Sequence, residues 1–127
     1  MKQKIASWIS GYVKKCGAKG VVLGLSGGLD SAVAAALCKG ALGKSRVLCL
    51  VMPCGSQKED LLDAALVIKE LKLKSRTVDL TQAYKAILKM LPSSSRMAGA
   101  NLKARLRMAV LYYFANNFDY LVSGTSN

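Results

Sequence analysis

The stretch GVVLGLSGGLDSAVAAALC, residues 20–38, decides the fold prediction because its residue composition changes twice. A continuous apolar run ends in serines, two adjacent glycines and an acid, and an alanine-rich segment follows. This pattern predicts a short buried strand, a tight turn, and a helix from about Asp30 to Lys39 with Gly40 as its end. The turn therefore lies where a strand leads into a helix, and such turns bind anions through backbone N–H groups.

The rest of the chain alternates between helix and strand in the same way. Apolar residues at helical spacing precede the first strand, and Pro53 ends a second buried strand at 46–52. Ser56 and Glu59 match a capping box that opens the next helix. The remaining expected elements are a more exposed strand at 75–80, a helix that Thr81 caps and Pro92 closes, a loop at 93–99, a long helix from Asn101 and a strand at 120–124. This order predicts an α/β fold, one doubly wound domain with a parallel sheet covered on both faces.

Composition predicts a soluble, cytoplasmic protein. The chain has 127 residues, of which 52% are hydrophobic, and only two prolines. No apolar run reaches the roughly 18 residues of a membrane span, and the start of the chain lacks a secretory signal. The four cysteines form no C-x-x-C pair and no histidine is present, so we expect reduced thiols rather than a zinc site. Cys38 and Cys49 are expected in the core and Cys54 in the loop after the second strand.

The net charge of +12 favours anionic partners, namely nucleotides, nucleic acid or acidic surfaces. The charge is spread along the chain, so a solvated basic surface is favoured over a dedicated nucleic-acid patch. We therefore expect no nucleic-acid partner and no membrane partner.

Two other glycine motifs are excluded by chemistry. GLSGG matches the G-x-S-x-G nucleophile elbow, but without histidine the chain cannot build a Ser-His-Asp triad. GALGKS, residues 40–45, ends like a Walker A loop but has two residues between its glycines where that motif needs four.

SGGLDS, residues 26–31, is instead predicted to hold a phosphate group. Gly27 and Gly28 allow close backbone approach to an anion, and Ser26 and Ser31 supply hydroxyl donors. An acid beside a phosphate calls for a cation between them, so Asp30 indicates Mg²⁺. The alternative for Asp30 is a plain acid at a helix N-terminus.

SGGLDS resembles the pyrophosphate loop of the ATP-pyrophosphatase family, whose members adenylate a substrate with ATP. The resemblance implies the adenine nucleotide alpha hydrolase-like fold, a Rossmann-like three-layer sandwich. It also assigns the loop to ATP, through Gly24, Leu25, Ser26, Gly27, Gly28, Leu29, Asp30 and Ser31.

Two later segments are similar to the ammonia-dependent NAD synthetases: GANLKARLRMAVLYYFA, residues 99–115, and LVSGTSN, residues 121–127. The resemblance implies that Arg105 contacts deamido-NAD, that Thr125 contacts ATP and that Asp30 binds Mg²⁺. Gln57 is a weaker ATP candidate, because it lies in the loop where the family binds adenosine but also beside a capped helix start.

The long helix offers an independent check of Arg105. Leu102, Leu106, Ala109 and Tyr113 define an apolar stripe, from which Arg105 lies about 70° away and Arg107 about 130° away at 100° per residue. Arg105 is thus expected to edge an interior cleft and Arg107 to face solvent. The alternative is an Arg105 that snorkels beside the stripe.

The resemblance implies a C–N bond-forming ligase that amidates deamido-NAD with ammonia, giving NAD, AMP and pyrophosphate through an acyl-adenylate. ATP is the co-substrate, Mg²⁺ the cofactor, no side chain acts as a nucleophile, and the full-length enzyme is a homodimer. The alternatives left open are a tRNA-modifying adenylating enzyme and a non-catalytic nucleotide-binding module.

In the resembling family the chain continues well beyond GTSN. Residues 1–127 are therefore expected to form the N-terminal part of a single ATP-pyrophosphatase domain whose remainder is absent. Alone, this part is predicted to be inactive, and the fourth strand is predicted to leave an exposed edge that favours self-association.

Overall fold

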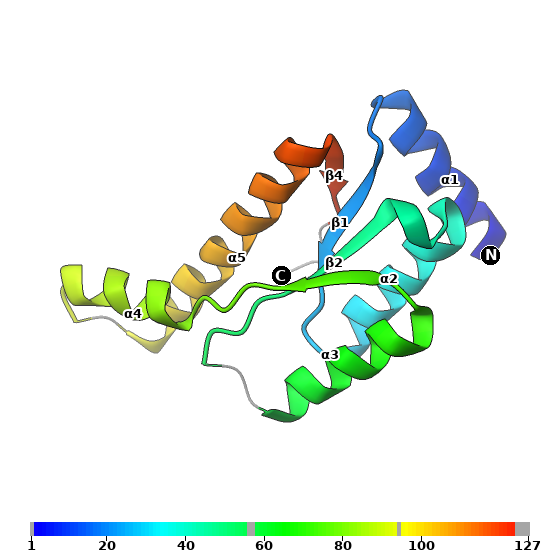
Figure 1. Cartoon of the computed structure of the whole chain (residues 1–127). Helices are drawn as coiled ribbons and strands as arrows, with labels where there is room; N and C mark the ends of the chain where they lie inside the picture. The colour runs from blue at the N-terminus through cyan, green and yellow to red at the C-terminus, as the bar shows by residue number, and fades with distance from the viewer. Residues whose placement is uncertain (1, 56–57, 94, 124–127) are drawn as a thin grey trace.

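The computed structural model describes residues 2–55, 58–93 and 95–123. Helices and strands alternate along the chain, as the sequence predicts, except for two consecutive helices before the last strand (Figure 1). The elements are α1 (Lys2–Lys15), β1 (Gly20–Gly24), α2 (Leu29–Leu42), the 3₁₀ turn η1 (Lys44–Arg46), β2 (Val47–Val51), α3 (Lys58–Leu71), β3 (Lys74–Thr77), α4 (Thr81–Met90), α5 (Arg96–Phe118) and β4 (Tyr120–Val122).

The sheet is parallel throughout, with strand order β3-β2-β1-β4. In the register, Val21 lies beside Val47 of β2 and Leu121 of β4, so β1 is a central strand. β4 forms one edge of the sheet, as expected. Because all four strands are parallel, their carboxyl ends lie along one edge of the sheet. The loops that follow β1 and β2 leave from this carboxyl-terminal edge.

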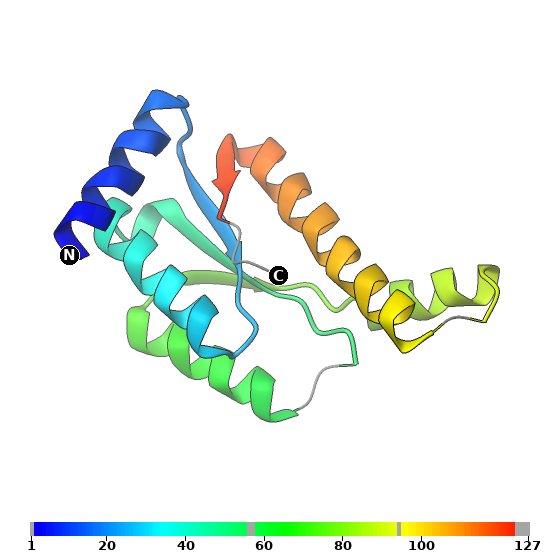
Figure 2. The same cartoon turned by 180° about the vertical axis from the view of Figure 1, so that it is seen from behind.

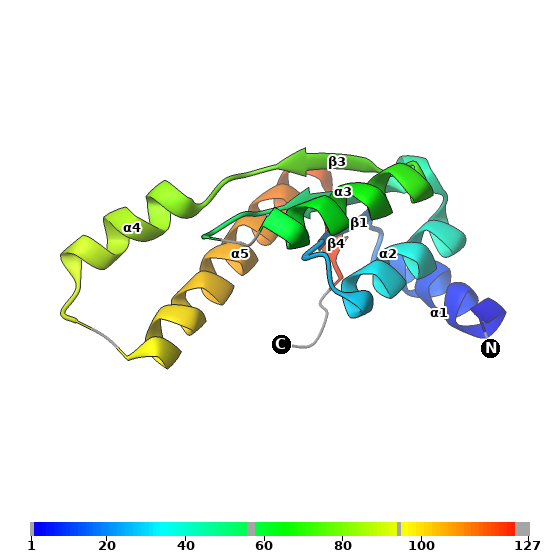
Figure 3. The same ribbon diagram turned by 90° about the horizontal axis from the view of Figure 1, so that it is seen from below.

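Helices cover both faces of the sheet, which confirms the doubly wound, three-layer prediction. α1, α2 and α3 lie on one face and α5 on the other (Figures 1 and 2). Successive strand residues point to opposite faces, so Val21 and Leu23 pack under α1–α3 while Val22 packs under α5. α4 contacts α5 and projects away from the sheet (Figure 3).

The helix that follows β1 runs past its predicted end. Gly40 lies inside α2, where its exposed position tolerates a glycine, and the helix ends at Gly43 instead. Gly43 has φ +84°, a conformation that glycine adopts without a Cβ penalty, and its N–H donates to the Lys39 carbonyl.

α5 begins at Arg96, inside the segment predicted to be a loop, and not at Asn101. The cause is Ser95, whose Oγ accepts a hydrogen bond of 3.2 Å from the backbone N–H of Ala98. The predicted helix start at Ser56 lies outside the described residues, and α3 is described from Lys58.

Thr81 does not cap α4 but is its first residue. Its backbone N–H donates to Asp79 Oδ1 at 3.0 Å, and its own Oγ1 accepts from the N–H of Gly55 at 3.3 Å. β3 ends at Thr77 rather than at residue 80. Backbone hydrogen bonds to β2 and its loop nevertheless continue after it, from the N–H groups of Val78 and Leu80.

Cys38 and Cys49 are buried, as predicted, and Cys54 is buried as well. All four cysteines lie among the described residues, and none is part of a disulfide there. Desolvation by burial, with a smaller contribution from the nearby Cys38, raises the pKa of Cys49 to about 11. Cys49 is therefore a protonated core thiol at neutral pH. Among the described helices none is long and apolar enough to cross a membrane.

Candidate functional site

The predicted phosphate loop lies between β1 and α2, at the edge where the strands end (Figure 1). Leu25 is buried, and its N–H donates to the Leu50 carbonyl at 2.9 Å, which extends the pairing of β1 with β2 by one residue. The chain then turns through exposed Ser26 and Gly28 into α2. This edge of a parallel sheet is the usual ligand side of doubly wound folds.

The two serines of the loop bond to each other and to the loop backbone. Ser31 is only 4% exposed, its Oγ donates to the Gly28 carbonyl at 3.1 Å, and it accepts from the Ser26 N–H at 3.3 Å. Ser26 Oγ lies 3.3 Å from Ser31 Oγ and accepts from the Gly28 N–H at 3.4 Å. Ser31 was predicted to donate to an anion, and here its hydroxyl shapes the turn.

Gly27 is required both by its conformation and by a close neighbour. Its φ of +88° lies in the left-handed region, and a Cβ at this position would collide with the backbone carbonyl of Asp60. Asp60 lies in the first turn of α3, so the loop rests directly on the start of that helix. The spacing of the sequence indicated a tight turn but gave no sign of this contact.

Asp30 is exposed in the first turn of α2. The N-cap is Gly28, which makes no side-chain cap bond, so the helix presents its positive end beside the loop. Within the described part of the chain no group of three or more His, Cys, Asp or Glu residues could hold a metal. One exposed carboxylate beside a phosphate loop still suits Mg²⁺, which binds through one or two carboxylates together with phosphate oxygens.

The loop that leaves β2 is held from two sides. On one side, Val51 O and Pro53 O accept from the N–H groups of Val78 and Leu80, at 2.8 and 2.7 Å. On the other side, the carbonyl of Met52 accepts from Arg107 Nε of α5 at 3.0 Å.

The prediction that Arg107 faces solvent is therefore wrong. Arg107 is half-buried and donates to the β2 loop, while Arg105 is exposed. The side of α5 that packs on the sheet is shifted from the predicted stripe. Leu111 and Ala115, outside that stripe, are buried, whereas Tyr113, within it, is 67% exposed. Apolar residues occur around most of this helix, so periodicity alone could not identify the side that packs on the sheet.

Gln57 and Thr125 lie outside the described residues. The structure therefore brings together residues 24–31 and the β2 loop, and leaves Arg105 on the outer side of α5.

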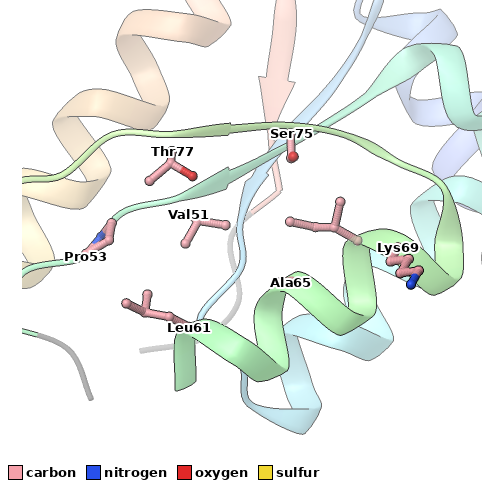
Figure 4. Close-up of a pocket in the computed structure, with 8 residues that line it drawn as sticks. Val51, Pro53, Leu61, Ala65, Lys69, Ser75 and Thr77 are labelled. Atoms are coloured by element: carbon pink, nitrogen blue, oxygen red, sulfur yellow. The ribbon is translucent and has the colours of Figure 1, made fainter. Parts of the chain in front are cut away.

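A cavity of about 340 Å³ lies beside this region, between α3 and the β2–β3 half of the sheet (Figure 4). Its lining is mainly apolar, with Ser75 and Thr77 on the β3 side and Lys69 on α3. None of the predicted site residues that the structure describes lines it.

The family model described as NAD synthase matches residues 1–127. The NH(3)-dependent NAD(+) synthetase of Pyrobaculum aerophilum is 49% identical over 127 residues, covering 97% of this chain and 48% of that protein. This chain thus spans about half the length of the curated relatives that it matches.

Solved structures agree with the fold. The NH3-dependent NAD synthetase from Campylobacter jejuni has a TM-score of 0.93 and 38% sequence identity, covering 99% of this chain and 55% of that one. The NMN synthetase from Francisella tularensis has a TM-score of 0.91 and 35% identity, with 99% and 53% covered.

Proposed function

This chain belongs to the NAD synthase family, and from that premise we propose that its protein is an ATP-dependent ligase that amidates deamido-NAD with ammonia. The products are NAD, AMP and pyrophosphate. The observation that carries the proposal is the loop of residues 24–31, which ends a central parallel strand and leads into the uncapped N-terminus of α2. This geometry suits a polyphosphate.

ATP lies with its phosphates on the loop, where Gly27 and Gly28 allow the backbone to come close. Asp30 would hold Mg²⁺, and the ion would supply positive charge close to the phosphates of ATP. The nicotinate carboxylate attacks the α-phosphate of ATP, pyrophosphate leaves, and ammonia then displaces AMP from the acyl-adenylate. The chain supplies positioning and charge, and no side chain needs to act as a nucleophile.

Three further residues have proposed contacts. Arg105, exposed on α5, binds an anionic part of deamido-NAD. Gln57 and Thr125 bind ATP, from the loop after β2 and from the segment after β4. We also propose that the protein acts in the cytoplasm as a homodimer.

The test incubates the complete gene product that contains this chain with ATP, Mg²⁺, ammonia and deamido-NAD. AMP and pyrophosphate should form in step with NAD. AMP release that requires tRNA and ignores deamido-NAD would refute the proposal. A parallel reaction with nicotinic acid mononucleotide tests whether the enzyme amidates this smaller substrate. Faster amidation of the mononucleotide than of deamido-NAD would refute deamido-NAD as the substrate.

A further inference from the structure

Arg107 lies where two loops separate at the edge of the sheet. Alternate backbone carbonyls of a strand point to opposite sides. On the side of β1, the Leu50 carbonyl accepts from Leu25, and the next carbonyl on that side belongs to Met52. β1 has by then turned into the phosphate loop, and Arg107 Nε donates to the Met52 carbonyl in its place, at 3.0 Å.

We propose that Arg107 is a positioning residue for ATP, which sets the path of the β2 loop relative to the phosphate loop. This inference rests on the proposed function, in which one loop takes the phosphates and the other the adenosine of the same nucleotide. The two loops diverge at Leu25 and Met52, and Arg107 holds the β2 loop at that point of divergence.

Two other contacts indicate that this region is packed to a defined shape. A Cβ on Gly24 would lie 3.2 Å from the Met52 side chain, so the last residue of β1 leaves room for the first residue of the β2 loop. One helical turn before Arg107, Lys103 places its Nζ 3.7 Å from where a Cβ on Gly55 would lie and 5.1 Å from the Tyr84 ring centre. α5 therefore lies close to both described ends of the β2 loop, at Met52 and at Gly55.

A guanidinium suits this position. Its hydrogen bond to a carbonyl is charge-assisted, and its planar Nε–H has a fixed direction, whereas a lysine ammonium ends in freely rotating donors. Loss of such a bond should relax the β2 loop without removing any group that touches the phosphates. Nucleotide affinity should fall, and the affinity for deamido-NAD should be little changed.

Arg46 offers a matched control. Its Nε also donates to a backbone carbonyl, that of Lys19, at 2.8 Å. Arg46 directly precedes β2, whereas Arg107 bonds to Met52, which directly follows β2. The two arginines therefore make the same kind of bond at opposite ends of this strand.

The experiment uses the complete gene product and the variants Arg107→Met, Arg107→Lys and Arg46→Met. Titration calorimetry gives the Kd of MgATP, steady-state kinetics gives both KM values, and thermal unfolding checks the fold. We expect Arg107→Met to raise the Kd and KM of ATP about tenfold, with the KM of deamido-NAD within about twofold. Arg107→Lys should show a smaller rise, and Arg46→Met should leave the Kd of ATP unchanged while lowering the Tm.

The inference is overturned if Arg107→Met leaves the Kd of ATP within twofold of the wild-type value, if Arg46→Met weakens ATP as strongly, or if the wild-type protein does not bind MgATP. Should Arg107→Met fail to fold, Arg107→Lys decides by the same criterion. A wild-type protein that binds MgATP but forms no NAD refutes the proposed function alone, because the ATP titrations still test Arg107.

Discussion

At the scale of single residues, the candidate site depends on which positions must be glycine and which must be charged. Gly27 and Gly28 look alike in the sequence, yet the structure separates them. Gly27 has a positive φ and touches the backbone of Asp60, whereas Gly28 has φ −81° and a Cβ there would meet Ser26 Oγ at an ordinary 3.5 Å. Only the first of the two positions excludes a side chain.

We predict that Gly27→Ala destabilises the protein by about 2 kcal/mol, through the left-handed conformation and the collision with Asp60. Gly28→Ala should cost less than about 1 kcal/mol, because alanine adopts its conformation and only the N-cap preference is lost. Urea denaturation of both variants measures the difference. Equal losses would mean that the loop does not rest on α3 as described.

The charge of Asp30 is tested by Asp30→Asn. Asparagine keeps the size and suits a helix start as well as aspartate does, but it removes the negative charge that Mg²⁺ needs. We expect MgATP binding to weaken about tenfold or more while the Tm stays within a few degrees. Asp63→Asn, an exposed acid of α3, is the control. If Asp30 only serves the helix, both variants will bind MgATP like the wild type.

At the scale of elements, α5 is the helix that the sequence describes least well. It carries both Arg105 and Arg107, and its start and its packing side both differ from the prediction. Ser95 decides the start, since its hydroxyl satisfies one of the N–H groups that the first helical turn leaves without a backbone partner.

Ser95→Ala should therefore cost about 1 kcal/mol. The loss should appear as faster amide hydrogen exchange at residues 96–98, while the second half of α5, which packs on the sheet, stays protected. Ser93→Ala removes an exposed hydroxyl before the helix and is the control. Uniformly faster exchange along α5 would show that the cap supports the whole helix and not its first turn.

At the scale of the molecule, apolar side chains are exposed on both layers. On α1, Trp8 is 69% exposed and stacks on Tyr12, with ring centres 5.4 Å apart. On α5, the exposed set is larger and comprises Met97, Met108, Tyr112, Tyr113 and Phe118. The proposed homodimer would cover such a surface.

We predict that the dimer forms through α5, so Tyr113→Glu should shift the sedimentation coefficient from dimer to monomer. Trp8→Glu, an equally drastic change on α1, should leave the dimer intact. The reverse result would place the interface on the other layer, and a monomeric wild type at high concentration would contradict the dimer. That residues 1–127 alone do not synthesise NAD stays a prediction, for which the complete gene product is the comparison.

The sequence by itself determined the order of helices and strands, the parallel sheet and the position of the glycine turn between β1 and α2. The helices, the strands and the glycine turn are local features, because each leaves a pattern within a few neighbouring residues. Gly40 misled the prediction, since a glycine's position in the chain does not reveal whether its φ is positive. The tertiary structure alone decided that Gly27 rests on Asp60 and that Arg107, not Arg105, turns inward to Met52. Both contacts join residues far apart in the chain, and helical periodicity defines the sides of α5 without saying which side meets the sheet.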